Sequence, residues 1–488
     1  MADKHGHEFR RELRVLDSTM LVMGSMIGSG IFIVSADIAR TVGGPGPLLL
    51  VWLITGLITI TAALSYGELA GMMPHAGGQY VYLREAFNPL IGFLYGWTLF
   101  LVIQSGTIAA VAVAFAKFTA LLLPSLGETT ILLTVFGHHV TAAQVVAIAT
   151  ILILTGVNLR GIHGGRIVQN VFTIAKTTAL FGLIAVGLLL AHNHEAFASN
   201  LTRFWETSWT KVSDGGVTVT PLAGFSILAA FGVAMVGSLF SSDAWNNITF
   251  TAGEVVNPKK TIPISLAAGT AIVTVLYILA NVSYIGLLPF WGSPDGTDVM
   301  SRGIQFAASE RVGTAAAWVM FGPPAAVIMA VLIMVSTFGC NNGLILAGAR
   351  VLYAMAKDGL FFKKCGSLNS HGVPGVALAL QAVWASLLCV SGTYGNLLDY
   401  VVFAVLIFYI LTVAGIFVLR WRRPDVDRPY KAFGYPVVPA IYILAALAIS
   451  LDLLIYKPAY TWPGVVIVLL GLPVYALWRY RRRAASTP

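Results

Sequence analysis

The stretch GSMIGSG at residues 24–30 puts small and polar residues in the middle of an apolar run. The run covers about residues 15–42, and about 20 apolar residues are enough to cross a bilayer. Each glycine in a helix interior costs about 1 kcal/mol relative to alanine. A helix that breaks inside a membrane must find partners for its freed N–H groups, because no water is there to bind them. The stretch therefore predicts a membrane helix that is interrupted near its middle.

A matching interruption lies in the second half of the chain. The apolar run at about residues 222–253 contains SSDAWNN at residues 241–247. Interrupted spans at corresponding places in two halves are typical of transporters built from inverted repeats, and they point to the binding site. The two runs are five spans apart, so the second copy starts from the opposite side of the membrane. The pattern predicts a transporter.

The composition indicates a polytopic membrane protein. Of the 488 residues, 57% are hydrophobic and 10% are charged, and the mean hydropathy is +0.82. Soluble domains carry about 25% charged residues and place them on the surface. We therefore expect an all-α integral membrane protein of one domain, residues 1–488, with about twelve transmembrane helices. The predicted spans are residues 15–42, 47–73, 87–123, 140–158, 168–191, 222–253, 262–289, 315–355, 374–391, 397–421, 437–456 and 461–480.

The basic residues indicate the orientation of the chain. Roughly 22 of the 30 lysines and arginines fall in the N-terminus, in every second loop, at the inner end of the eighth span or in the C-terminal tail. Loops rich in lysine and arginine stay in the cytoplasm. We therefore expect a multi-pass protein of the cell membrane with both termini cytoplasmic. The net charge of +9 is divided among short clusters, so the chain does not fit a nucleic-acid-binding protein.

Sequence motifs of enzymes and metal sites are absent. Cys340, Cys365 and Cys389 are scattered without a CxxC pair, which speaks against a disulfide framework and a zinc site. The sequence also lacks HExxH, GxSxG and the P-loop pattern. We expect neither an enzyme nor a bound cofactor or metal.

Residues 28–30, GSG, allow two interpretations. Freed N–H groups at the start of the following half-helix would bind a substrate carboxylate, which the helix dipole also favours. Alternatively, Gly24 and Gly28 form a small-xxx-small contact with a neighbouring helix, a frequent pattern in membrane proteins.

Asp243 is a carboxylate inside an apolar run, where a lone charge is costly and usually marks a pathway or a site. Backbone carbonyls around it would receive a substrate ammonium group, with Phe240 and Trp245 as aromatic walls. The alternative is a structural carboxylate that is bonded to local backbone or to Asn246 and Asn247. Two interrupted spans together favour the first interpretation.

Lys176 is the second charge inside an apolar run, in the fifth span, where a lysine costs about 2.5–3.5 kcal/mol on insertion scales. An ammonium group can take the place of a bound monovalent cation and hold the same carbonyls that sodium would. The alternative is snorkelling of the long side chain to the cytoplasmic interface.

Three more charged residues lie near the predicted inner ends of spans two, six and eight: Glu68, Glu254 and Arg350. In sequence, the first two are near Arg84 and the lysines at 259–260. We interpret these three residues as candidate inner-gate or structural ion pairs. A role of the two carboxylates as proton carriers is the alternative.

Several motifs resemble the amino acid–polyamine–organocation (APC) superfamily of transporters, particularly the bacterial and L-type amino acid permeases. They are GSMIGSGIF at 24–32, YGELA at 66–70 with PHAGGQY at 74–80, EVVNPKKTIP at 254–263 and ARVLYAMAKDG at 349–359. With the number of spans, the resemblance covers about the whole chain. It implies a LeuT-like fold with broken helices 1 and 6, inverted repeats at about residues 15–191 and 222–421, and two added helices at about 437–480.

The resemblance also implies alternating access around a central amino acid. The amides of Ser29 and Gly30 would bind its carboxylate, and the carbonyls of Met26, Phe240 and Asp243 would bind its ammonium group. Phe240 would be the aromatic gate, and Lys176 matches the lysine that fills the sodium position in sodium-independent members. The predicted substrate-binding set is Met26, Ile27, Gly28, Ser29, Gly30, Phe240, Ser241, Ser242, Asp243 and Trp245.

One departure from the L-type pattern bears on the substrate. Where L-type permeases have FAYGGW, this chain has FSSDAW at residues 240–245, so Ser242 replaces a tyrosine and Asp243 adds a carboxylate. We predict small neutral amino acids as substrates. A cationic amino acid or a polyamine held by Asp243 is the alternative.

The sequence therefore predicts a sodium-independent secondary transporter, either an amino acid antiporter or a proton symporter. Its predicted partners are the amino acid and the lipid bilayer, and nothing in the chain indicates a partner subunit. A substrate sensor or a channel on the same fold is the alternative from a different class. No added signalling domain supports a sensor, and a channel would not need an amino acid pocket.

Overall fold

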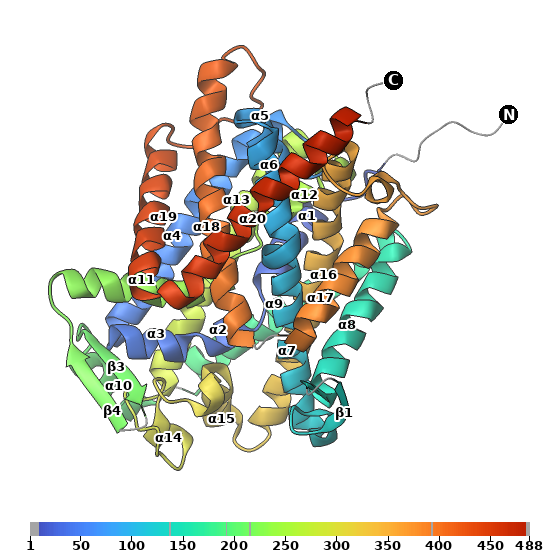
Figure 1. Ribbon diagram of the computed structural model, residues 1–488. Helices are drawn as coiled ribbons and strands as arrows, with labels where there is room; N and C mark the ends of the chain where they lie inside the picture. Colours follow the sequence, from blue (N-terminus) through green and yellow to red (C-terminus); the bar gives the residue numbers. More distant parts are fainter. Residues whose placement is uncertain (1–8, 136–137, 192, 214–215, 392–393, 485–488) are drawn as a thin grey trace.

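The computed structural model describes residues 9–484 except 136–137, 192, 214–215 and 392–393, and its architecture is a bundle of long helices (Figure 1). Within these residues, ten helical stretches are long and apolar enough to cross a membrane, and α11 and α17 are shorter apolar helices. The spans, in chain order, are α1 (Val15–Met26) with α2 (Gly30–Ile33) and α3 (Ser35–Val42); α4 (Pro45–Met72); α6 (Pro89–Thr98) with η1 (Leu99–Ile103) and α7 (Gln104–Leu122); α8 (Ala142–Leu159); α9 (Ile162–Leu189); α11 (Phe225–Ser241) with α12 (Asn247–Phe250); α13 (Pro258–Leu287); α16 (Ala325–Lys357); α17 (Gly375–Ser391); α18 (Tyr394–Arg422); α19 (Val437–Tyr456); and α20 (Pro458–Ala484). The predicted multi-span helical fold is confirmed.

Both expected interruptions are present. The first span stops being helical after Met26, and Ile27 is extended, with ψ 97°. The sixth span stops after Ser241, and Ala244 has a left-handed φ of 64°, which a residue with a Cβ adopts only at some cost. Two short half-helices, α2 and α12, continue the spans beyond the breaks.

The third and eighth predicted spans differ from simple helices. In the third, Leu99–Ile103 forms a π-helical turn, a feature that is frequent at functional sites. The run predicted at 315–355 is two helices, α15 (Val312–Phe321) and α16. They separate because Gly322 has a φ of 67° and is followed by two prolines, which donate no backbone hydrogen bonds.

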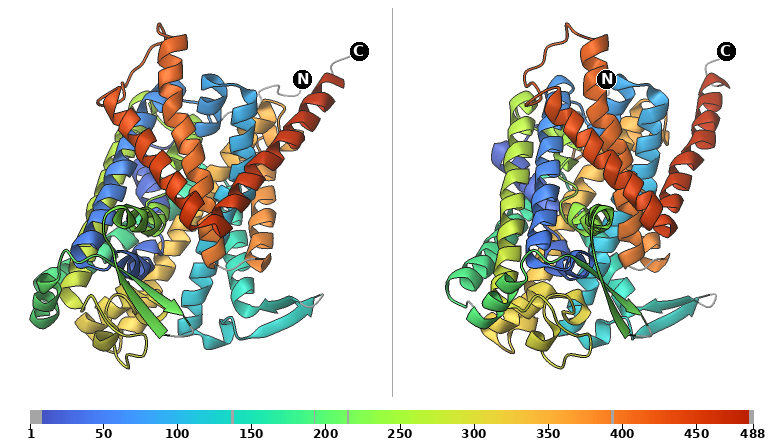
Figure 2. Two further views of the ribbon diagram at one scale, coloured as in Figure 1. Left: turned by 60° about the vertical axis from the view of Figure 1, so that its left-hand side comes forward. Right: turned by 90° about the vertical axis from the view of Figure 1, so that its left-hand side faces the viewer.

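The two ends of the bundle are unlike each other. Both ends of the described chain lie on one side, which we call the chain-end face (Figures 1 and 2). Helix α5 (Gln79–Ala86) and the short turn η5 (Lys363–Gly366) belong to connections on this side. The opposite side, the hairpin face, carries two antiparallel hairpins and further short helices. These are β1 (Ile131–Val135) with β2 (His138–Thr141), β3 (Ser208–Ser213) with β4 (Gly216–Pro221), α10 (His194–Thr202), α14 (Val299–Arg302), η4 (Ala308–Glu310) and α15.

The interrupted spans lie among the other helices. α1 packs against α9, α13 and α16, whereas α11 packs against α3, α4 and α19. α18 and α20 lie against each other, and α20 also contacts α6 on the outside of the bundle (Figure 2). Each break is therefore enclosed by helices on several sides.

Candidate functional site

The break in the first span is buried and leaves backbone amides at its centre. The Ile27 amide still donates to the Met23 carbonyl, at 2.9 Å. In the described part of the chain, the amides of Gly28, Gly30 and Ile31 have no hydrogen-bond acceptor. These groups lie at the start of α2, where the N–H groups of a helix are free to bind an anion.

The glycines around this break have different surroundings. A Cβ on Gly24 would collide with the side chains of Gln169 and Thr173 on α9, so Gly24 forms a close helix contact. A Cβ on Gly28 would meet only the Cys340 sulfur, at 3.6 Å. The small-residue interpretation therefore describes Gly24 and not Gly28. Gly30 is also a close approach, because a Cβ there would collide with the Ser241 hydroxyl.

The break in the sixth span turns around Asp243. Its amide donates to the Phe240 carbonyl, at 3.1 Å, and one carboxylate oxygen accepts from the Tyr409 hydroxyl of α18, at 2.6 Å. The Ala244 amide also reaches this carboxylate. The Asp243 side chain thus lies beside local backbone, where the structural alternative expected it, and its hydrogen bond is to α18, a contact between segments too distant for sequence reasoning to find.

Ser241, Ser242 and Trp245, which are also predicted site residues of this break, form hydrogen bonds or ring contacts with nearby parts of the protein. The Ser241 hydroxyl donates to Gly237, at 2.8 Å, and the Ser242 amide closes the end of α11 by donating to Ser238, at 3.0 Å. The buried Trp245 ring contacts Tyr66 and Tyr409, with ring centroids 4.7 and 5.2 Å apart.

Asn246 pairs with a side chain from the α5 region and not with Asp243. Its amide nitrogen donates to the Gln79 carbonyl oxygen, at 2.8 Å, and the Gln79 nitrogen donates to Thr412 of α18, at 3.0 Å. The Gly77 amide donates to the Phe250 carbonyl at the end of α12, at 3.0 Å. Gln79 therefore joins α12 to both α5 and α18.

Lys176 of α9 points into the bundle at the first break. Its ammonium group donates to the carbonyls of Gly24, at 2.6 Å, and Ile27, at 2.5 Å, and contacts the Ser336 carbonyl of α16 at 3.3 Å. The side chain is 2% exposed, so it does not snorkel to the membrane surface. The cation is surrounded by carbonyl oxygens from α1, the break and α16.

Two residues that the sequence reasoning missed hold the broken backbone. The Tyr277 hydroxyl of α13 lies between the Met26 carbonyl, at 3.1 Å, and the Ser241 carbonyl, at 3.0 Å. The Ser336 hydroxyl contacts the carbonyls of Ile27 and Gly28, at 3.1 and 3.0 Å. Tyrosine and serine are common within apolar runs. The one signal in the sequence for these roles was that Tyr277 and Ser336 lie near the middle of their predicted spans.

Two small cavities flank Asp243. The first lies toward α4 and α19 and is lined by Thr59, Ser242 and Tyr442 among others. The second lies toward η1, α7 and α12. Each has about 20 Å³, room for little more than one water molecule. An amino acid enters this region only if the surrounding helices move.

The candidate gate residues divide into two separate clusters. Glu254 and Arg350 form a bidentate ion pair between η3 (Ala252–Glu254) and α16, with N–O distances of 2.8 and 3.0 Å. Both side chains are 1% exposed. A buried pair of this kind is expensive to break on one side, because the remaining charge is left without a partner.

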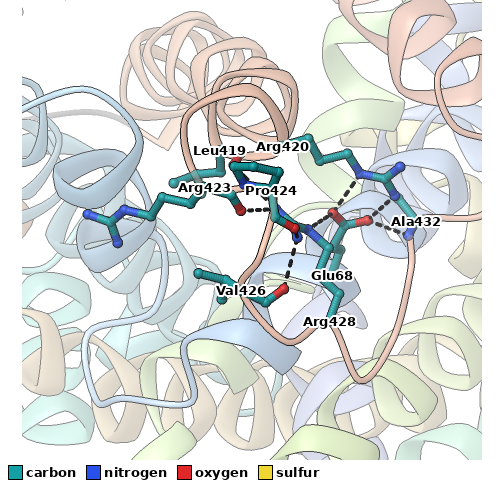
Figure 3. A network of polar contacts seen from close by, with 8 residues as sticks. All are labelled: Glu68, Leu419, Arg420, Arg423, Pro424, Val426, Arg428 and Ala432. Carbon is teal, nitrogen blue, oxygen red and sulfur yellow. Dashed lines mark hydrogen bonds and ion pairs between the residues drawn. The ribbon is translucent and has the colours of Figure 1, made fainter.

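Glu68 belongs to the second cluster (Figure 3). Its carboxylate accepts from Arg420, at 2.9 and 2.6 Å, and from the Ala432 amide, at 2.6 Å, and Arg428 lies 3.4 Å away. Arg428 in turn donates to four backbone carbonyls, that of Leu419 in the last turn of α18 and those of Arg423, Pro424 and Val426 in the loop that follows. Glu68 therefore anchors the connection between α18 and α19 and takes no part in the Glu254–Arg350 pair.

Arg84, the residue near Glu68 in sequence, pairs elsewhere on the chain-end face. It contacts Asp358 and Glu85, and Glu85 also accepts from Arg423, at 2.9 Å. Partial burial opposes ionisation of Glu85, but the hydrogen bonds from Arg423 and Arg84 outweigh it and lower the pKa of this carboxyl.

Known proteins resemble this chain over nearly its full length. A family model described as amino acid permease matches residues 13–473. The serine/threonine exchanger SteT of Bacillus subtilis is 28% identical over 480 residues, which cover 98% of each protein. The human large neutral amino acids transporter small subunit 2 is 29% identical over 493 residues, 99% of this chain and 83% of that protein. The mouse b(0,+)-type amino acid transporter 1 is 28% identical over 475 residues, which cover 96% of this chain and 88% of that protein.

Because Glu254 and Arg350 are a buried ion pair, we predict a large loss of stability when only one of the two charges is removed. Arg350→Met leaves a buried carboxylate unpaired, and we expect it to cost about 3–5 kcal/mol. Thermal unfolding in detergent measures this loss. The double variant Arg350→Met/Glu254→Leu removes both charges and should recover most of it. A double variant as unstable as the single one would contradict the ion-pair explanation.

The surroundings of Gly28 and Gly30 predict different effects of an alanine substitution at each position. Gly30→Ala forces a methyl group against Ser241, whose Cα lies 3.2 Å from the place that the new carbon would take. Overpacking costs about 1–3 kcal/mol, so we expect a clear drop in the unfolding midpoint. Gly28→Ala is the matched control and should leave the midpoint unchanged. Adding Ser241→Gly to Gly30→Ala should restore it, and no rescue would refute the steric account.

Proposed function

This chain belongs to the amino acid permease family, and from that membership we propose that it is a sodium-independent transporter that exchanges small neutral amino acids across the cell membrane. As a member of this family, it is a multi-span membrane protein that transports amino acids and is not an enzyme. The exchange mode, the substrate size and the independence from sodium are the proposed parts. The observation that carries the proposal is the position of Lys176, whose cation occupies the carbonyl cluster beside the first break.

The substrate backbone would bind between the two breaks. A carboxylate binds N–H donors, and the amides of Gly28, Gly30 and Ile31 at the start of α2 are such donors. The Ser29 amide lies among them in the sequence. The carbonyls of Met26, Phe240 and Asp243 would receive the ammonium group. Two of them already accept one hydrogen bond, from Tyr277 and from the Asp243 amide, and each carbonyl oxygen has a second lone pair. Phe240, partly exposed on α11, would close over the bound amino acid.

Lys176 would serve as a fixed cation. A sodium ion needs a shell of oxygen ligands, and carbonyl oxygens of Gly24, Ile27 and Ser336 are the ligands that such a site offers. Because the ammonium group already neutralises these dipoles, a second cation in the same place would meet repulsion at short range. Transport should therefore proceed without sodium.

The pairing of Asp243 supports neutral substrates. One carboxylate oxygen is held by Tyr409 and the Ala244 amide is also within reach, so a cationic side chain would compete with existing partners. A cationic amino acid or polyamine is the second candidate, because a buried carboxylate is a strong partner for an ammonium group. The name of the Bacillus subtilis relative describes an exchanger of serine and threonine, which are small and neutral.

The membrane arrangement is also part of the proposal. We place the chain-end face in the cytoplasm, because it carries basic clusters such as Lys363–Lys364 and Arg420–Arg423. The repeats at residues 15–191 and 222–421 would be related by inversion, since each contains one interrupted span at its beginning. The Glu254–Arg350 pair would then close the cytoplasmic side of the pathway and open during each cycle.

Uptake by reconstituted protein tests the transport mode. Labelled alanine or serine is supplied to proteoliposomes without sodium at fixed pH, with or without amino acid inside. We expect uptake only into vesicles preloaded with amino acid, because an exchanger needs a counter-substrate. Uptake into empty vesicles that rises with an inward proton gradient would replace exchange by proton symport. An ion current in the absence of any amino acid would favour a channel.

The fixed-cation role predicts the behaviour of a Lys176 variant. Lys176→Met keeps the apolar stem and removes the charge, together with the hydrogen bonds that the ammonium group donates to three carbonyls. We expect exchange to fall at least tenfold, and addition of sodium not to restore it, because the variant lacks the rest of an ion site. Lys117→Met, at a half-exposed lysine of α7, is the control. Exchange at the parent rate in Lys176→Met would disprove the role.

A further inference from the structure

The cavity beside η1 and α12, which we call the Asp243 cavity, contains buried polar groups that lack partners. It is lined by Asp243 and Ala244 of the break, by Asn247 of α12 and by Tyr95 of α6. Within the described residues, the Tyr95 hydroxyl and the Asn247 side-chain nitrogen have no hydrogen-bond partner. These residues are only 2% and 1% exposed. A buried polar group without a partner is costly, so we expect a group bound in the cavity to form hydrogen bonds with both of them.

The other polar side chains that line the Asp243 cavity are already bonded. Gln104 donates to the Leu344 carbonyl, at 2.8 Å, and Thr107 donates to the Ile103 carbonyl, at 2.5 Å. Gln79 and Asn246 bond each other. The unmet demand of the cavity is therefore two donors, from Tyr95 and Asn247, and the acceptor capacity that Asp243 retains beside Tyr409.

A hydroxyl group fits this demand. It donates one hydrogen bond and accepts two, so it can donate to Asp243 while accepting from Tyr95 and Asn247. A methyl group would satisfy none of the three residues. An ammonium group has three donors and no acceptor, which leaves the Asn247 N–H unpaired. The volume of about 20 Å³ also suits a group the size of one water molecule.

The cavity lies where the side chain of a bound amino acid would extend. Asp243 and Ala244 belong both to its wall and to the break whose carbonyls would hold the substrate ammonium group. A hydroxyl on the β-carbon is two bonds from the α-carbon. The apolar residues Leu99, Ile103 and Val405 complete the wall and suit the methyl group of threonine.

We propose that the Asp243 cavity binds the side-chain hydroxyl of the substrate and that the transporter therefore selects serine and threonine over alanine and 2-aminobutyrate. This inference rests on the proposed function and specifies its substrate class. A site built to bond a hydroxyl rejects analogues without it, because its own polar groups are then left unpaired.

The test compares two phenylalanine substitutions in the full-length protein in proteoliposomes. Tyr95→Phe removes the hydroxyl that lines the cavity. Tyr82→Phe removes another deeply buried hydroxyl, from a residue that is 1% exposed and does not line the cavity, and is the matched control. Competition against labelled substrate gives apparent affinities for serine, threonine, alanine and 2-aminobutyrate.

In the parent protein we expect serine to bind at least tenfold more tightly than alanine. Tyr95→Phe should cut this ratio about five- to tenfold, through weaker serine binding with alanine unchanged, and Tyr82→Phe should preserve it. Asn247→Leu, a similar volume without the donor, should act like Tyr95→Phe and provides a second variant if the first is not produced.

Three outcomes would overturn the inference. Equal affinities for serine and alanine in the parent would exclude a hydroxyl-selective cavity. An equal loss for serine and alanine in Tyr95→Phe and Asn247→Leu would indicate a structural water in the cavity. An unchanged ratio in both variants would place the hydroxyl elsewhere. Transport of alanine and serine without discrimination would still leave the proposed function intact, whereas absence of any amino acid transport would refute that function itself.

Discussion

Backbone groups freed by two helix breaks inside the membrane are the constraint on which the rest of the structure depends. Without water, each such group needs a partner from the protein. The Lys176 ammonium and the Ser336 hydroxyl serve the carbonyls of the first break, and Tyr277 bridges the two breaks through Met26 and Ser241. These contacts hold carbonyls, whereas the amides of Gly28, Gly30 and Ile31 have no acceptor among the residues that the structure describes. The protein thus provides more partners for the freed carbonyls of the breaks than for these three amides.

Much of this arrangement could be predicted because it depends on local patterns. The apolar runs predict the spans, and the clusters at 24–30 and 241–247 predict both breaks. Hydropathy alone joins the two helices within 315–355, so their separation was not predicted, although Gly322 and the two following prolines indicate it. The cost of a charge in the membrane made Lys176 a candidate partner of carbonyls with snorkelling as the alternative, and its contacts in the fold distinguish the two.

Contacts between distant segments could not be predicted in the same way. Glu68 binds Arg420 across 352 residues of sequence, and Tyr277 meets Met26 across 251. Sequence proximity suggested Arg84 for Glu68, but α4 and α18 bring a different arginine to it. Periodicity reports which face of a helix is apolar and not which helix lies opposite. A polar side chain that serves one distant carbonyl leaves no repeating signal, so residues such as Tyr277 and Ser336 emerge only from the fold.

The bonds of Gln79 have a mechanical consequence. This one side chain is tied to Asn246 just before α12 and to Thr412 of α18, while the neighbouring Gly77 holds the far end of α12. The four-residue half-helix is therefore hydrogen-bonded near both of its ends to residues 77–79, where the chain enters α5. If α12 tilts, these hydrogen bonds require α5 and α18 to move with it. Residues 74–78, which connect α4 to α5, would then act as a hinge. The length of this loop, and not only its sequence, would limit how far the pathway can open.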